Sequence, residues 1–152
     1  RGLEIAKTAG VVTVFNPAPA VALEPDIYRL CDYVTPNESE ASLLTGVLVA
    51  TLEDARRAGD ALLEMGAGMA VITLAEKGVL LHGRGMSLHI PAFEVSPVVE
   101  TAGAGDAFKG AFAVGLARGD GPEAAARFAC AAAAISVTRP GTAPSMPTLA
   151  EV

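Results

Sequence analysis

Short apolar runs rich in β-branched residues recur along the chain and indicate buried strands. They predict strands over residues 11–15, 33–35 and 69–74, and a hairpin whose strands cover 79–82 and 87–90. Pro17 lies two residues after the first run and Pro36 directly follows the second. Because proline cannot donate to a strand ladder, these strands should end there.

Between these runs the apolar residues recur at helical spacing. In residues 51–65, Ala55, Ala58 and Leu62 would share one face, with charged residues on the other. The same pattern predicts helices over 26–30, 37–44, 122–137 and from about Asp106 or Ala107 to Arg118. Strands that alternate with helices predict an α/β fold with a parallel sheet covered on both faces.

The two ends of the sequence read as parts of helices. Residues 2–9 resemble the end of a helix with no start signal before it, and residues 148–152 resemble the first turn of another. We therefore expect the sequence to be a piece of a longer protein.

Composition and charge narrow the class of protein. The chain has 152 residues, of which 51% are hydrophobic, and this length and composition are typical of one globular domain. A net charge of −6 argues against a nucleic-acid partner. The longest apolar run, Phe128–Ile135, is too short to span a membrane. The two cysteines form no metal or disulfide motif, and together with the lack of a signal peptide they predict a cytoplasmic protein.

The sequence Thr101-Ala-Gly-Ala-Gly-Asp106 before a predicted helix is the strongest candidate for chemistry. Glycines let a ligand approach the backbone, and a helix start offers unpaired N–H groups to an anion. Asp106 could then act as a base, or it could simply be the N-cap of the helix, which the spacing alone favours. A dinucleotide fingerprint is excluded by Phe108, and no P-loop is present.

Residues 101–108 resemble the second signature of the ribokinase, or PfkB, family of carbohydrate kinases. Three more segments resemble the family in the same order, namely 16–20, 35–41 and 127–145. The resemblance implies a three-layer α/β/α, Rossmann-like ribokinase fold with a mostly parallel sheet. Residues 1–152 would form its C-terminal, ATP-binding half, without the N-terminal sugar-binding part and lid.

The resemblance also implies roles for individual residues. Asp106 would be the catalytic base, and Gly103, Ala104 and Gly105 would form an anion hole. With Gly105 and Asp106, the nucleotide would contact Asn37, Thr73, Ala75, Glu76, Gly78 and Cys130. Asn37 and Glu40 also fit a helix capping box, Ala75 replaces a family glycine, and Cys130 could equally be a small core residue.

Cation sites follow from the same resemblance. Glu40 would hold Mg²⁺ through water, and a K⁺ ion would be held by Glu100, Ala102, Ser136, Arg139, Gly141 and Ser145. The family has aspartate where this chain has Glu100, and commonly asparagine where it has Lys109, to which we assign no role. His82 and His89 are interpreted as structural.

The resemblance implies a kinase that moves the γ-phosphate of ATP to the primary hydroxyl of D-ribose. Its partners would be the sugar and ATP, and the full-length protein would be a homodimer. Two alternatives stay open: a non-catalytic nucleotide-binding fragment, and a PfkB kinase for fructose, 2-keto-3-deoxygluconate or a nucleoside. The isolated chain is expected to be inactive.

Overall fold

A computed structural model describes residues 1–21 and 23–152 of the chain. These residues form two compact units. The first contains Arg1–Leu74 and Leu80–His89, and the second contains Ala75–Val79 and Ile90–Val152.

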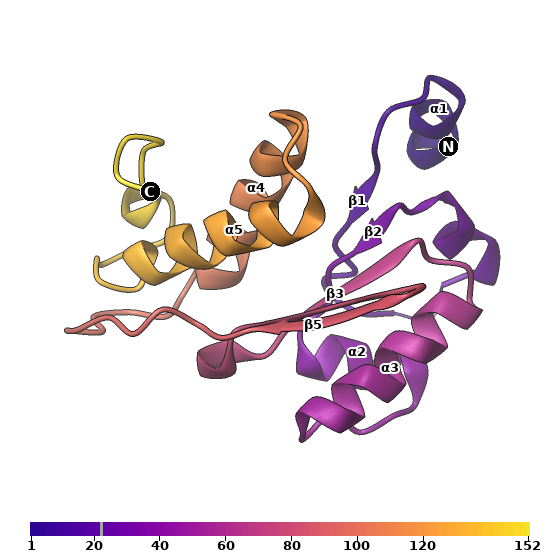
Figure 1. Ribbon diagram of the computed structural model, residues 1–152, viewed down its shortest axis with the longest axis horizontal. Helices are drawn as coiled ribbons and strands as arrows, with labels where there is room; N and C mark the ends of the chain where they lie inside the picture. The colour runs from indigo at the N-terminus through magenta and orange to yellow at the C-terminus, as the bar shows by residue number, and fades with distance from the viewer. Residues whose placement is uncertain (22) are drawn as a thin grey trace. The chain divides into compact units, whose positions relative to one another are not determined.

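A five-stranded sheet organises the first unit, in the order β1-β2-β3-β4-β5 (Figure 1). Its strands are β1 (Val14–Phe15), β2 (Tyr33–Val34), β3 (Met69–Thr73), β4 (Val79–Gly83) and β5 (Met86–Ile90). β1, β2 and β3 pair in parallel, and β4 and β5 form the predicted hairpin. The predicted α/β class is therefore confirmed.

Helices of the first unit pack beside the sheet. They are α1 (Gly2–Thr8), the 3₁₀ helix Pro25–Leu30, α2 (Glu38–Thr45) and α3 (Leu52–Glu64). α2 and α3 lie along one face of the sheet and contact β3 (Figure 1). The core between them is fully buried at Leu62 and Ile72, so the apolar stripe predicted for α3 is the face that it buries.

The first strand is shorter than its apolar run predicted, because residues 11–13 do not pair as a strand. Val11 and Val12 are more than half exposed. Thr13 instead donates its N–H to the Asp32 carboxylate at 2.9 Å, and Lys7 reaches the other oxygen of Asp32 at 2.6 Å. The Thr13 carbonyl still accepts the Tyr33 N–H at 3.0 Å, so the Asp32 side chain takes the place of a strand partner only at the Thr13 N–H.

The second unit is built on two helices, α4 (Ala104–Ala117) and α5 (Pro122–Ser136). They pack closely because their contact residues are small: a Cβ on Gly115 would lie 2.8 Å from Ala125 Cβ. Phe108 and Phe112 of α4 are buried with their rings stacked, 6.0 Å between centroids. Residues 148–151 form one turn, closed by the Glu151 N–H to the Thr148 carbonyl. In the described ranges, we find no helix with the length and apolar character of a membrane span.

Candidate functional site

Two candidate residues of the first unit meet where the parallel strands end. Thr73 closes β3 and donates its N–H to the Pro36 carbonyl at 3.0 Å, which pairs Thr73 with Asn37 in a parallel bridge. This edge of a parallel sheet is where α/β proteins bind their ligands. The sheet thus brings two predicted nucleotide-binding residues side by side.

Asn37 and Glu40 form the capping box that their spacing predicted. Glu40 donates its N–H to Asn37 Oδ1, and Asn37 donates its N–H to Glu40 Oε2, both at 2.8 Å. One Glu40 oxygen is therefore occupied, and Oε1 is the atom that could face a metal through water. No three His, Cys, Asp or Glu side chains cluster as metal ligands in residues 1–21 and 23–152. A Mg²⁺ ion fits only if nucleotide phosphates and water supply most of its ligands, which is its usual mode of binding.

The glycine turn of the second unit sets where α4 begins. Gly103 is the N-cap, with a left-handed φ of 83°, and a Cβ on it would lie 3.3 Å from Thr142. Only glycine suits both the backbone conformation and this contact. The helix therefore starts at Ala104, and Asp106 stands third in it without making a capping bond. The interpretation of Asp106 as the N-cap is wrong.

Three N–H groups at this turn are open to a ligand. In the described part of the chain the N–H groups of Gly103, Gly105 and Asp106 donate to nothing, whereas Ala104, the other predicted member of the anion hole, donates to the Thr101 carbonyl. The first turn of a helix carries a partial positive charge, so such groups attract an anion. The exposed Asp106 stands beside them.

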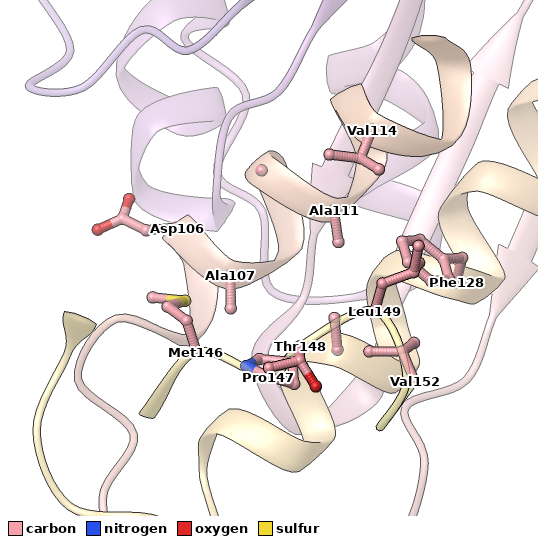
Figure 2. Close-up of a pocket in the computed structure, with 12 residues that line it drawn as sticks. Asp106, Ala107, Ala111, Val114, Phe128, Met146, Pro147, Thr148, Leu149 and Val152 are labelled. Carbon is pink, nitrogen blue, oxygen red and sulfur yellow. The ribbon is translucent and has the colours of Figure 1, made fainter. Parts of the chain in front are cut away.

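Asp106 also lies at one end of a pocket of about 290 Å³ in the second unit. Figure 2 shows its carboxylate pointing away from the apolar residues at the other end. α4, α5 and the C-terminal segment line the pocket through Asp106, Ala107, Gly110, Ala111, Val114, Phe128, Ala132, Met146, Pro147, Thr148, Leu149 and Val152. The C-terminal segment was absent from the sequence-based site, because nothing in its local pattern places it near residue 106.

The loop 75–78 has a strained backbone at its first residue. Ala75, which stands where the family has glycine, adopts a left-handed φ of 48°. At the other end of the loop, Gly78 has a φ of 98°, and a Cβ on it would lie 2.1 Å from the Ile90 carbonyl oxygen. Glu76 between them is exposed. The loop thus has a glycine conformation at both ends but a glycine at only one.

Cys130 lies in the middle of α5 and is 6% exposed. Burial raises the pKa of its thiol to about 11, against a smaller lowering by Arg127, so the group is a neutral thiol at physiological pH. It does not line the pocket beside Asp106. Its place against an adenine ring stays a prediction.

Two loops of the second unit that carry the predicted K⁺ ligands are linked directly. The Glu100 carboxylate accepts the Gly141 N–H at 2.7 Å, and the Val137 carbonyl accepts the N–H groups of Val99 and Glu100. The Arg139 side chain is held by Glu151, which leaves its carbonyl as the group that could face a cation.

The oxygens near this link suit a monovalent cation. The carbonyls of Ala102, Arg139 and Gly141 accept no hydrogen bond from any residue that the structure describes. Unpaired backbone carbonyls are the ligands that replace the hydration shell of K⁺. Ser136 and Ser145 are buried and donate their hydroxyls to nearby carbonyls, at 2.8 and 2.7 Å. These oxygens are of the kind that binds K⁺, and the K⁺ site itself stays a prediction.

Comparisons with known proteins agree on one family. The family model described as pfkB family carbohydrate kinase matches residues 2–149. The chain is 43% identical to a ribokinase of Haemophilus influenzae over 97% of its length and 48% of the relative's. It is 39% identical to a deoxyribokinase of Salmonella typhi, covering 98% of this chain and 49% of the other.

A solved structure extends this similarity to the fold. The Arabidopsis thaliana ribokinase complexed with ribose and ATP superimposes with a TM-score of 0.94 at 32% identity, over 98% of this chain and 48% of that one. The chain therefore spans about half the length of the relatives that it matches.

Proposed function

The chain belongs to the pfkB family of carbohydrate kinases, and we propose that it is the ATP-binding half of a ribokinase-like sugar kinase. One observation carries the proposal: an exposed carboxylate, Asp106, stands at the same turn as three N–H groups that have no acceptor among the described residues. Phosphoryl transfer needs positioning and charge stabilisation more than covalent chemistry, and this turn offers both beside a base.

In the proposed reaction the sugar hydroxyl attacks the γ-phosphorus of ATP. Its oxygen forms the new P–O bond while the bond to the β–γ bridging oxygen breaks, so ADP leaves. Asp106 accepts the hydroxyl proton, and the Gly103–Asp106 turn binds the transferred phosphoryl group through backbone N–H groups. Asn37, Thr73 and the 75–78 loop would contact the nucleotide.

Cations would act on the phosphates and on the loops. Mg²⁺ held through water by Glu40 would neutralise phosphate charge, and K⁺ held by the carbonyls near Glu100 would support the loops beside the anion hole. The ribokinase complexed with ribose and ATP supports ATP as the nucleotide.

D-Ribose is the proposed acceptor, because relatives that match nearly the whole of this chain are ribokinases. The test is the complete gene product assayed with ATP and D-ribose, 2-deoxyribose, fructose, 2-keto-3-deoxygluconate and a nucleoside. We expect the highest kcat/KM with ribose and a product phosphorylated on the primary hydroxyl. A higher kcat/KM with another acceptor would reassign the substrate, and no transfer to any of them would overturn the function.

Two further properties are proposed with this function. We propose a homodimer, which sedimentation of the complete gene product would test, and a cytoplasmic location, which cell fractionation would test. Removal of Mg²⁺ by EDTA should abolish transfer.

A further inference from the structure

Lys109 follows Gly105 by four residues, one turn later on the same side of α4. Its Nζ lies 3.9 Å from the position that a Cβ on Gly105 would take. Side chains on a helix lean toward its N-terminus, and this one brings its ammonium group back over the first turn. The charge therefore lies close to the turn whose N–H groups are open.

In the part of the chain that the structure describes, no carboxylate forms an ion pair with the Lys109 ammonium group. Across residues 1–21 and 23–152, the ion pairs formed by Asp and Glu side chains do not include Lys109. Asp106, three residues earlier on the same helix, forms no ion pair with it among the described residues either. The ammonium group and the partial positive charge of the helix start thus lie together with no anion from the protein.

Such an arrangement favours an anionic ligand over an empty site. Two positive groups close together repel each other, and a bound anion removes that repulsion while it gains both attractions. The only carboxylate in this turn, Asp106, would be occupied with the hydroxyl proton. The anion that satisfies both groups must then come from the substrate.

We propose that Lys109 is a phosphate-binding catalytic residue of this chain, whose ammonium group contacts the γ-phosphate of ATP. The inference rests on the proposed function. The γ-phosphate is the one implied, because Asp106 can take the proton only from a hydroxyl that attacks the phosphorus held at the same turn. Where the family commonly has asparagine, this chain supplies a full positive charge to the group being transferred.

A contact with the γ-phosphate makes a specific prediction for binding. ATP has this phosphate and ADP does not. Removal of the Lys109 charge should therefore weaken the binding of ATP and leave the binding of ADP unchanged. Lys109→Gln removes the charge with a side chain only one atom shorter and a similar helix preference, and Lys109→Arg keeps the charge. Arg84→Gln, at the exposed turn between β4 and β5, removes one positive charge elsewhere and is the matched control.

The experiment measures the Kd of an ATP analogue that is not hydrolysed, and of ADP, for the complete gene product by calorimetry, with kcat for ribose phosphorylation alongside. For Lys109→Gln we expect an ATP-analogue Kd about tenfold weaker, an unchanged ADP Kd and a kcat lowered about 10- to 100-fold. Lys109→Arg should keep most of the affinity for the ATP analogue and most of kcat. Arg84→Gln should match the wild type in both quantities.

Several results would overturn the inference. One is an ATP-to-ADP affinity ratio that stays the same in Lys109→Gln, and another is an equal loss in Arg84→Gln. A shift of the pH–rate profile with no change in this ratio would show that Lys109 acts on Asp106 instead of on the phosphate. If the wild type phosphorylates no sugar, the proposed function fails, and the affinity ratio still decides the role of Lys109.

Discussion

Gly59 of α3 and His82 of β4 are packed so closely that no side chain fits at position 59. A Cβ on Gly59 would lie 2.7 Å from Cδ2 of the His82 ring. The ring is buried and bonded at both nitrogens, to Asp60 Oδ1 at 2.8 Å and to Ser87 Oγ at 3.0 Å. His82 thus joins α3 to the hairpin, which agrees with its interpretation as structural.

Replacement of Gly59 by alanine should destabilise the protein. Alanine favours a helix by about 1 kcal/mol over glycine, but overpacking against a held ring costs about 1–3 kcal/mol. We expect a lower free energy of unfolding in urea, and a loss in Gly59→Ala/His82→Ala that is smaller than the sum of the losses in the two single variants. Gly110→Ala is the control, because a Cβ there meets nothing within 4 Å. It should be neutral or stabilising, and an equal loss in both variants would contradict the packing argument.

Local patterns were enough to predict the regular parts of the fold. The spacing of Ala55, Ala58 and Leu62 predicted a helix over 51–65, and α3 covers Leu52–Glu64. The Asn37 and Glu40 spacing predicted the capping box that begins α2. These features depend on residues close together in the sequence, so the sequence shows them.

Features that depend on distant residues could not be predicted in this way. The start of α4 is set by the left-handed Gly103 against Thr142, nearly forty residues away, so Asp106 looked like a cap. The Glu100 link to Gly141 and the place of the Lys109 ammonium group likewise need coordinates. The roles of the site residues in catalysis stay predictions.

Replacement of Ala75 by glycine should be less destabilising than replacement of an alanine inside an α-helix. Its φ of 48° is a left-handed conformation, which costs an L-residue about 1–2 kcal/mol. Glycine removes that cost, but it loses more conformational entropy on folding, which lowers the free energy of unfolding by about 0.5–1 kcal/mol. We expect Ala75→Gly to be neutral or up to about 1 kcal/mol stabilising in urea unfolding, whereas Ala61→Gly in α3 should destabilise. Equal destabilisation by both would show that Ala75 is unstrained.

Asp106→Asn should lower the rate far more than it weakens nucleotide binding. The change keeps the size of the side chain and removes the base, and loss of a general base costs about 10²–10⁴-fold in kcat. We expect this loss in ribose phosphorylation by the complete gene product, with an ATP Kd near that of the wild type. Asp26→Asn, at an exposed position of the first unit, is the control. A near-normal kcat with a raised KM for ribose would make Asp106 a binding residue.

The 152-residue chain alone should show negligible sugar kinase activity. It spans about half of the ribokinases it matches, and Asp106 is exposed in it. Catalysis of phosphoryl transfer depends on a positioned acceptor and an active site closed to water. A coupled ADP-release assay with ribose, on a sample verified by intact mass, measures this. Robust ribose-dependent turnover would contradict the proposal that a further part of a kinase is required.

The hydrogen bond between Glu100 and Gly141 leads to a prediction of how K⁺ changes kcat. Glu100 already joins its loop to Gly141 at 2.7 Å, and unpaired carbonyls of Ala102 and Arg139 belong to the same two loops. If a cation binds there, K⁺ should raise the kcat of the complete gene product above its value in Na⁺ at equal ionic strength. Equal ionic strength is needed because salt screening alone changes affinity for ATP.

Glu100→Asp separates the two functions of this carboxylate. The shorter side chain restores the family residue but should lengthen or break the bond to Gly141, so the loops would depend more on the cation. We therefore expect K⁺ activation to increase in Glu100→Asp, with lower activity than the wild type in Na⁺. Activation that is unchanged by the substitution would mean that Glu100 does not act on the cation site. No cation dependence in either protein would mean that the glutamate bridge has replaced the site, and the proposed K⁺ ion would then be wrong.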